Sequence, residues 1–308
     1  MFNVEDKTFT VVPYTSLPQY AGSHVIFGSV RRASDGLKLN LPVPYIENDK
    51  LYGMVPLSSS VKNDPNALVK GVAHRGYSAE APENTIPAFE LAREKGYAYT
   101  ECDVIFTSDG VPVILHDDTI DRTSNGTGNV ADFTLAELKA LDFGSWKSEA
   151  YAGVQIPTFD EFIKTCKRLS LRPYIELKPA MSASQIEQLV DIVKRYNMLD
   201  HSVWTSFNYA NLTHVIATDP NADVCNATTS ITPEYIQKLV DLKTGSNVVY
   251  AYPYYPLLTS EAVTQIRENG LSIAVWTVNE VSDVMNMADL GVDAILTDKL
   301  NISSLLES

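Results

Sequence analysis

Residues 70–106, KGVAHRGYSAEAPENTIPAFELAREKGYAYTECDVIF, hold the strand–helix–strand pattern on which the fold prediction depends. A short β-rich run, Gly71–His74, opens the stretch, and a second, Tyr99–Phe106, closes it. Between them we predict a helix over Pro87–Lys95, because Asn84 or Thr85 can cap it and a proline fits its first turn. Two strands joined through a helix are typical of a parallel sheet.

The same alternation continues to the end of the chain. Further strands are predicted at Arg172–Leu177, Ser202–Ser206, Ala222–Cys225, Val248–Ala251, Ser272–Thr277 and Ala294–Leu296, and further helices at Phe159–Leu169, Ala183–Tyr196, Tyr209–Ala217, Pro233–Leu242, Ser260–Glu268, Val281–Leu290 and Ile302–Leu306. Eight such βα units predict an α/β fold, a (β/α)₈ TIM barrel, over residues 67–308. A doubly wound open sheet is the alternative, but it requires a glycine-rich phosphate turn after its first strand, and His74-Arg75-Gly76 is not one.

Residues 1–66 show a different pattern, which predicts a small N-terminal β-rich module. Short apolar runs, Val25–Phe27 and Leu51–Met54, are separated by turn signals such as Ala33–Gly36. We therefore divide the chain into residues 1–66 and 67–308. The small module is a candidate for assembling homo-oligomers.

Composition excludes several classes of protein. The chain has 308 residues, 45% of them hydrophobic, as in an ordinary soluble globular protein. Its three cysteines form no CxxC pair, which argues against a zinc–thiolate site or a disulfide framework. A net charge of −14 argues against nucleic-acid binding, although local cations still permit an anionic substrate. No apolar run approaches the roughly 20 residues that span a bilayer, and residues 1–10 lack a secretory signal, so we expect a cytoplasmic protein.

Acidic residues interrupt two of the predicted strands. Glu101 and Asp103 are two positions apart and therefore face the same side, which in a barrel strand is the interior. Two buried carboxylates side by side repel each other unless a cation lies between them, and a hard divalent ion, Mg²⁺ or Ca²⁺, fits best. Glu176 on the next strand can add a third carboxylate, while Lys178 can meet an anionic oxygen. The alternatives are a solvated strand edge for the first pair and a simple ion pair for the second.

Two histidines converge on the same rim of the predicted barrel. His74 ends the first strand, and a hairpin after the second strand brings His116 back to the barrel mouth. Histidines suit acid and base catalysis near neutral pH. Arg75 can bind phosphate through its planar fork of donors. The loop with Glu83 and Asn84 adjoins the start of the first helix, where backbone N–H groups favour anions, and we assign both residues to substrate binding.

The order of these motifs resembles the glycerophosphodiester phosphodiesterase family. The resemblance covers residues 70 to about 300 and rests on the following segments: His74-Arg75-Gly76, Pro82-Glu83-Asn84-Thr85, Glu101-Cys102-Asp103-Val104, Thr107-Ser108-Asp109-Gly110, His116-Asp117-Asp118-Thr119-Ile120-Asp121-Arg122-Thr123, Asn125-Gly126-Thr127-Gly128, Ile156-Pro157-Thr158, Glu176-Leu177-Lys178, Ser206-Phe207, Val275-Trp276-Thr277-Val278-Asn279 and Thr297-Asp298. One departure stands out: family members often continue the last motif as Thr-Asp-x-Pro, and this chain has Leu300 in place of the proline.

The resemblance implies a TIM barrel that cleaves small glycerophosphodiesters to sn-glycerol 3-phosphate and an alcohol. It implies a divalent cation, Mg²⁺ or Ca²⁺, at the positions that match Glu101, Asp103 and Glu176. It also implies acid–base catalysis by His74 and His116. Further implied roles are phosphate binding by Arg75 and Lys178 and a pocket lined by Phe207 and Trp276.

Three alternatives stay open. Phe207 and Trp276 can equally be packing residues at the top of the barrel. The enzyme can be a barrel phospholipase acting on lysophospholipids or phosphoinositides, for which the aromatic stretch Tyr250–Leu258 would supply an apolar rim. A non-catalytic binding or structural protein is the remaining alternative, and the intact set of acids and histidines argues against it.

Overall fold

The computed structural model describes residues 28–31, 38–41, 45–47, 50–52, 69–178 and 180–306. Contacts divide the chain into residues 1–63 and residues 64–308. In the first unit, β1 (Gly28–Arg31) pairs antiparallel with β2 (Lys38–Leu41), and β3 (Tyr45–Glu47) pairs antiparallel with β4 (Lys50–Tyr52). The two hairpins agree with the predicted β-rich character. The candidate role of this segment in assembly falls outside the described residues.

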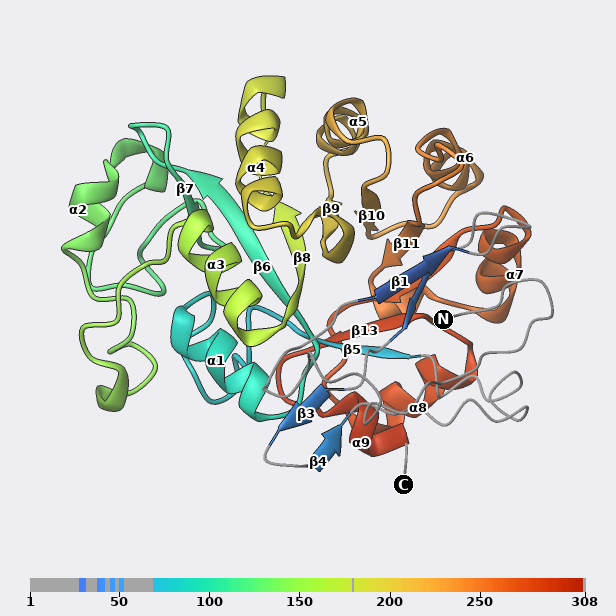
Figure 1. Cartoon of the computed structure of the whole chain (residues 1–308), viewed down its shortest axis with the longest axis horizontal. Helices are drawn as coiled ribbons and strands as arrows, with labels where there is room; N and C mark the ends of the chain where they lie inside the picture. Colours follow the sequence, from blue (N-terminus) through green and yellow to red (C-terminus); the bar gives the residue numbers. More distant parts are fainter. Residues whose placement is uncertain are drawn as a thin grey trace, which may run out of the picture. The chain divides into compact units, whose positions relative to one another are not determined.

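The second unit is a closed barrel of parallel strands surrounded by helices (Figure 1). Its strands, in their order around the barrel, are β5 (Lys70–Ala73), β6 (Tyr99–Phe106), β8 (Arg172–Leu177), β9 (Val203–Ser206), β10 (Asp223–Thr228), β11 (Val249–Pro253), β12 (Ser272–Val275) and β13 (Ala294–Thr297). Pairing of β5 with both β13 and β6 closes the ring. The predicted TIM barrel is therefore confirmed, and the open-sheet alternative is wrong because no edge separates the first and last strands.

The helices that follow the strands form the outer layer. They are α1 (Ile86–Glu94), α3 (Phe159–Leu169), α4 (Ala183–Arg195), α5 (Tyr209–Thr218), α6 (Pro233–Asp241), α7 (Ser260–Glu268), α8 (Val281–Asp289) and α9 (Ile302–Leu306). Local chemistry explains where α3 begins. The Thr158 hydroxyl accepts from the backbone of Glu161, whose carboxylate accepts from the Thr158 backbone. Phe159, Phe162 and Ile163 are fully buried, so one face of α3 packs towards the strands.

An insertion of residues 107–158 separates β6 from α3. It contains β7 (Pro112–Ile114), which runs antiparallel to β6, and the short helix α2 (Leu135–Lys139), which was not among the predicted helices. The insertion has a small core of its own with Val113, Leu115 and Ile120. No helix among the described residues is both long and apolar enough to cross a membrane.

Candidate active site

The first loop of the barrel turns sharply directly after β5. Arg75 and Gly76 both have positive φ, +57° and +77°. A Cβ on Gly76 would lie 2.6 Å from the Cβ of Ala88, so only glycine fits there. The turn brings the backbone N–H of Arg75 to Glu101, to which it donates over 2.8 Å. This loop therefore places His74 and Arg75 beside the acidic residues of β6.

Three carboxylates meet at the carboxyl-terminal end of the strands. Asp103 on β6 lies opposite Glu176 on β8, and Glu101 shares their side. One oxygen of each group lies within 4.8 Å of one oxygen of each other group. Exposure is 1% for Glu101, 1% for Asp103 and 8% for Glu176. The alternative of a solvated strand edge is therefore wrong, because these acids are removed from water.

The electrostatics of this cluster are unbalanced. Burial, reinforced by the charges of Asp103 and Glu176, raises the pKa of Glu101 well above its ordinary value. Burial and the charge of Asp103 also raise the pKa of Glu176. Burial acts in the same direction on Asp103, but the nearby charges of Arg75 and Lys178 outweigh it and lower the pKa of that carboxyl. The protein's own cations thus favour the ionised form of Asp103, and Glu101 is the carboxylate that most needs a further cation.

Protein cations offset only part of this negative charge. Lys178 Nζ lies 3.0 Å from Glu176 and 3.7 Å from Asp103, while Arg75 Nε lies 3.4 Å from Asp103. Oε1 of Glu101 is buried and has no hydrogen-bond partner among the described residues. A buried, unpartnered carboxylate oxygen beside two further carboxylates is an arrangement that a hard divalent cation satisfies. The three acids can therefore hold a metal ion.

Each candidate catalytic histidine is held by an aspartate. His74 Nδ1 lies 2.7 Å from Asp298, and His116 Nδ1 lies 2.6 Å from Asp117. With Nδ1 engaged, Nε2 is the ring nitrogen left to meet a substrate. His116 also lies near enough to Asp103 for its charge to contribute to the lowered pKa of that acid. The structure thus brings both histidines to the acidic cluster.

The two aspartates were missed as functional residues by sequence reasoning. Asp298 accepts hydrogen bonds from Asn279 and Ser78, at 2.6 and 3.1 Å. Burial acts to raise the pKa of Asp298, but the bonds from His74 and its neighbours hold that pKa at about 2. Arg122, with a contribution from His116, lowers the pKa of Asp117 to about 2. Both groups are therefore carboxylates at neutral pH, suited to orient an imidazole.

The residues assigned to substrate binding in the first loop contact protein partners. Glu83 accepts from Arg75 at 2.8 Å and from two nitrogens of Arg122, each at 2.8 Å. Asn84 donates to Asp103 over 2.8 Å and accepts from the Asp103 backbone over 3.3 Å. Glu83 thereby joins the first loop to the insertion, and Asn84 orients a carboxylate of the cluster.

Aromatic side chains occupy another sector of the same rim. Phe207, which follows β9, is 49% exposed and meets Trp276 edge to face, with ring centroids 5.4 Å apart. Tyr254 lies equally close to Trp276. The predicted pocket residues Phe207 and Trp276 therefore contact each other at the carboxyl-terminal ends of β9 and β12, two strands that β10 and β11 separate in the barrel. The exposure of Phe207 argues against the alternative that this side chain only packs at the top of the barrel.

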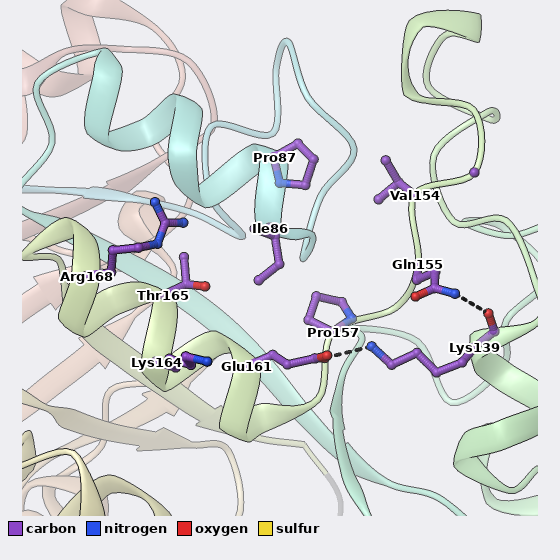
Figure 2. Close-up of a pocket in the computed structure, with 11 residues that line it drawn as sticks. Ile86, Pro87, Lys139, Val154, Gln155, Pro157, Glu161, Lys164, Thr165 and Arg168 are labelled. Carbon is purple, nitrogen blue, oxygen red and sulfur yellow. Dashed lines mark hydrogen bonds and ion pairs between the residues drawn. The ribbon is translucent and has the colours of Figure 1, made fainter.

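Two hollows in the barrel unit differ in chemistry. One, of about 370 Å³, lies at the mouth and is lined by His74, Arg75, Ser78, Ala79, Glu83, Trp146, Lys147 and Asp298. The other, of about 500 Å³, lies on the outside between α1, α3 and the insertion (Figure 2). Its acid, Glu161, accepts from Lys139 over 2.7 Å, and it contains none of the candidate site residues. The smaller hollow is therefore the candidate substrate site.

Comparison with known proteins agrees with this geometry. The model of the Glycerophosphoryl diester phosphodiesterase family matches residues 74–302. A glycerophosphodiester phosphodiesterase of Caldanaerobacter subterraneus subsp. tengcongensis is 35% identical, over 74% of this chain and 93% of that protein. One of Bacillus subtilis is 31% identical, over 80% and 90%. The solved structure of an Oleispira antarctica phosphodiesterase in complex with the product sn-glycerol-3-phosphate has a TM-score of 0.73 and 31% identity, over 78% of this chain and 98% of that one. The chain belongs to the glycerophosphoryl diester phosphodiesterase family.

Proposed function

We propose that this protein hydrolyses glycerophosphodiesters to sn-glycerol 3-phosphate and an alcohol, with a divalent cation held by Glu101, Asp103 and Glu176. The observation that carries the proposal is the buried cluster of three carboxylates with one unpartnered oxygen, flanked by two histidine–aspartate pairs. Family membership and the product-bound relative support the choice of substrate.

The cation and the basic residues divide the binding of the phosphoryl group. Mg²⁺ or Ca²⁺, the hard cations that prefer oxygen ligands, would act as a Lewis acid on a phosphoryl oxygen. Lys178 and Arg75 lie against the same carboxylates. Once a cation offsets the carboxylate charge, the N–H groups of Lys178 and Arg75 can donate hydrogen bonds to the phosphate oxygens. The charge that develops on the phosphoryl group then meets these donors beside the buried carboxylates.

The histidines carry the proton transfers. One imidazole removes a proton from the nucleophile, and the other protonates the departing alkoxide. With water as the nucleophile, sn-glycerol 3-phosphate forms directly. With the neighbouring glycerol hydroxyl as the nucleophile, a cyclic glycerol phosphate forms first, and water opens its ring in a second step to give sn-glycerol 3-phosphate. Asp298 and Asp117 fix the ring orientations through Nδ1, so that each Nε2 faces the reacting atoms. Glu83 and Asn84 act by positioning Arg75 and Asp103.

A direct assay tests the proposal. Purified full-length protein, stripped of metal and resupplied with Mg²⁺ or Ca²⁺, should release sn-glycerol 3-phosphate from glycerophosphoglycerol and glycerophosphocholine. Release of no product from any glycerophosphodiester with either cation would reject the function.

Hydrolysis of lysophospholipids is a second candidate, favoured by the exposure of Phe207, Tyr254 and Leu257. Those side chains give the rim an apolar part that an acyl chain can contact. Comparison of lysophosphatidylcholine with glycerophosphocholine separates the two. Faster cleavage of the lipid would favour the second candidate.

A further inference from the structure

One lysine at the mouth of the active site has no acidic partner among the described residues. Lys147, in the insertion, donates from Nζ to the backbone oxygen of Ser78 over 2.7 Å, and none of the ion pairs between described residues includes it. The other charged groups of the same hollow are engaged. Arg75 pairs with Glu83, and Asp298 pairs with His74. Lys147 therefore contributes to the hollow an ammonium group that pairs with no carboxylate of the described residues.

The position of this charge is well defined. Ser78, whose carbonyl receives Lys147, donates its own hydroxyl to the backbone oxygen of His74 over 2.9 Å. Two hydrogen bonds through Ser78 thus connect the Lys147 ammonium to the backbone of His74, a candidate catalytic residue. Lys147 and Trp146 both line the hollow of about 370 Å³ beside His74. A group that occupies this hollow while its phosphate meets Arg75 lies next to the Lys147 ammonium.

The adjacent indole does not reverse this preference. An exposed tryptophan ring attracts a quaternary ammonium through its π face. Trp146 is 37% exposed, but its ring already has Lys147 Nζ over it, 5.8 Å from the centroid. Trp146 Nε1 is bound to the Phe143 carbonyl at 3.0 Å, which fixes the ring. The ring therefore offers an apolar surface beside a cation, which suits an uncharged alcohol better than a cationic one.

We propose that the hollow formed by Trp146, Lys147 and the first loop receives the alcohol arm of the diester, and that Lys147 selects against positively charged alcohols. Uncharged polyols such as glycerol and inositol are then preferred to choline and ethanolamine. The inference rests on the proposed function, which supplies the diester. The variable alcohol arm meets a loop outside the barrel strands, and such βα loops are where TIM barrels vary specificity.

The test compares four substrates that share the glycerol phosphate arm. kcat/KM is measured, with metal supplied, for glycerophosphoglycerol, glycerophosphoinositol, glycerophosphocholine and glycerophosphoethanolamine. The wild-type protein should favour the two uncharged alcohols. Lys147→Met, which keeps length and removes charge, should narrow the ratio of uncharged to cationic substrates roughly threefold to tenfold, the range expected for removing one partly screened charge several ångströms away. Lys147→Arg, the matched control, should keep the wild-type ratio.

The ratio of kcat/KM for uncharged substrates to kcat/KM for cationic substrates distinguishes a role of Lys147 in selectivity from a purely structural role. If Lys147 only braces the first loop through Ser78, Lys147→Met lowers kcat/KM for all four substrates by one common factor, and the inference is overturned. A wild-type preference for the cationic substrates also overturns it. Trp146→Ala independently tests whether the alcohol arm, and not the glycerol arm, of the diester binds in the hollow. It should raise KM for glycerophosphoinositol more than for glycerophosphoethanolamine, whereas an equal rise would place the shared glycerol arm in the hollow and reject the inference. Hydrolysis of none of the four substrates would instead reject the proposed function.

Discussion

The two ends of the barrel handle charge in opposite ways. At the amino-terminal end, Lys70 at the start of β5 donates to the buried hydroxyl of Tyr250 over 2.9 Å, and Arg267 pairs with Asp293 over 2.8 Å. At the carboxyl-terminal end, three carboxylates crowd together and Oε1 of Glu101 is left unpartnered. At one end these two cations have hydrogen-bonding partners within the chain, whereas the other end holds an excess of negative charge that requires an external cation. Substitutions at the two ends should therefore separate stability from activity.

The largest effect is expected from the histidines. His74→Ala or His116→Ala should each lower kcat by roughly 10²–10⁴-fold, because either change removes an acid or a base from the transition state. Steady-state kinetics with a glycerophosphodiester measures the loss. His214→Ala, on the outer helix α5, is the control and should keep wild-type kcat. Near-normal kcat in both site variants would remove the histidines from the mechanism.

Next in size is the effect of Glu101→Gln on the metal-free protein. The amide keeps an oxygen for the Arg75 N–H but removes a carboxylate whose pKa is raised by burial and by two like charges. The free energy of unfolding in EDTA at pH 7 should rise by about 1–3 kcal/mol, while hydrolysis is lost. Chemical denaturation measures the first quantity. A variant less stable than the metal-free wild type would show that Glu101 is not strained by its neighbours.

Asp298→Asn should have a smaller effect on stability, with a defined dependence on pH. The native pKa of Asp298 is about 2, below its ordinary value of 3.8, so its ionised form stabilises the fold above about pH 4, and this contribution is lost as the pH falls through 2. Because the side chain is about one-third exposed, the loss at pH 7 should be only about 1 kcal/mol. The difference in denaturation midpoint between the variant and the wild type should be much larger at pH 7 than at pH 2, where native Asp298 is partly protonated. An equal difference at both values would exclude the charge as the cause.

The smallest effect is expected at the opposite end of the barrel. Lys70→Met leaves the Tyr250 hydroxyl without its donor and should lower the free energy of unfolding by about 0.5–1 kcal/mol. kcat should stay at the wild-type value, because the change lies at the end remote from the carboxylates. A fall in kcat without a fall in stability would contradict the division between the two ends. Tyr250→Phe removes the same bond from its other side and should show the same pattern.

Local pattern was enough to predict the barrel and its acidic cluster. β6 and β8 have the predicted bounds because each is a buried run flanked by clear turn signals. The facing of Glu101 and Asp103 follows from the two-residue period of a strand. The proximity of Glu176 follows from parallel strands that end at one rim. These features depend on neighbours in sequence or on the symmetry of the fold, so they can be predicted from the sequence alone.

Long-range partners were not predictable in the same way. Asp298 is 224 positions from His74 in the chain, and Arg122 is 39 positions from Glu83. Such pairs are set by the conformations of loops, which periodicity does not encode. Lys147 was missed for the same reason, since nothing in the Trp146-Lys147 dipeptide shows which loop it meets. One partner had a local signal: Asp117 directly follows His116, and the pair could have been proposed from adjacency.

The central claim is that Glu101, Asp103 and Glu176 hold a divalent cation that hydrolysis requires. Isothermal titration of EDTA-treated protein with Mg²⁺ and with Ca²⁺, combined with assays on the same samples, tests it directly. The account predicts one bound cation per chain, recovery of hydrolysis as that cation binds, and loss of both in Asp103→Asn and Glu176→Gln. Full hydrolysis by the EDTA-treated protein, with no cation bound, would contradict it.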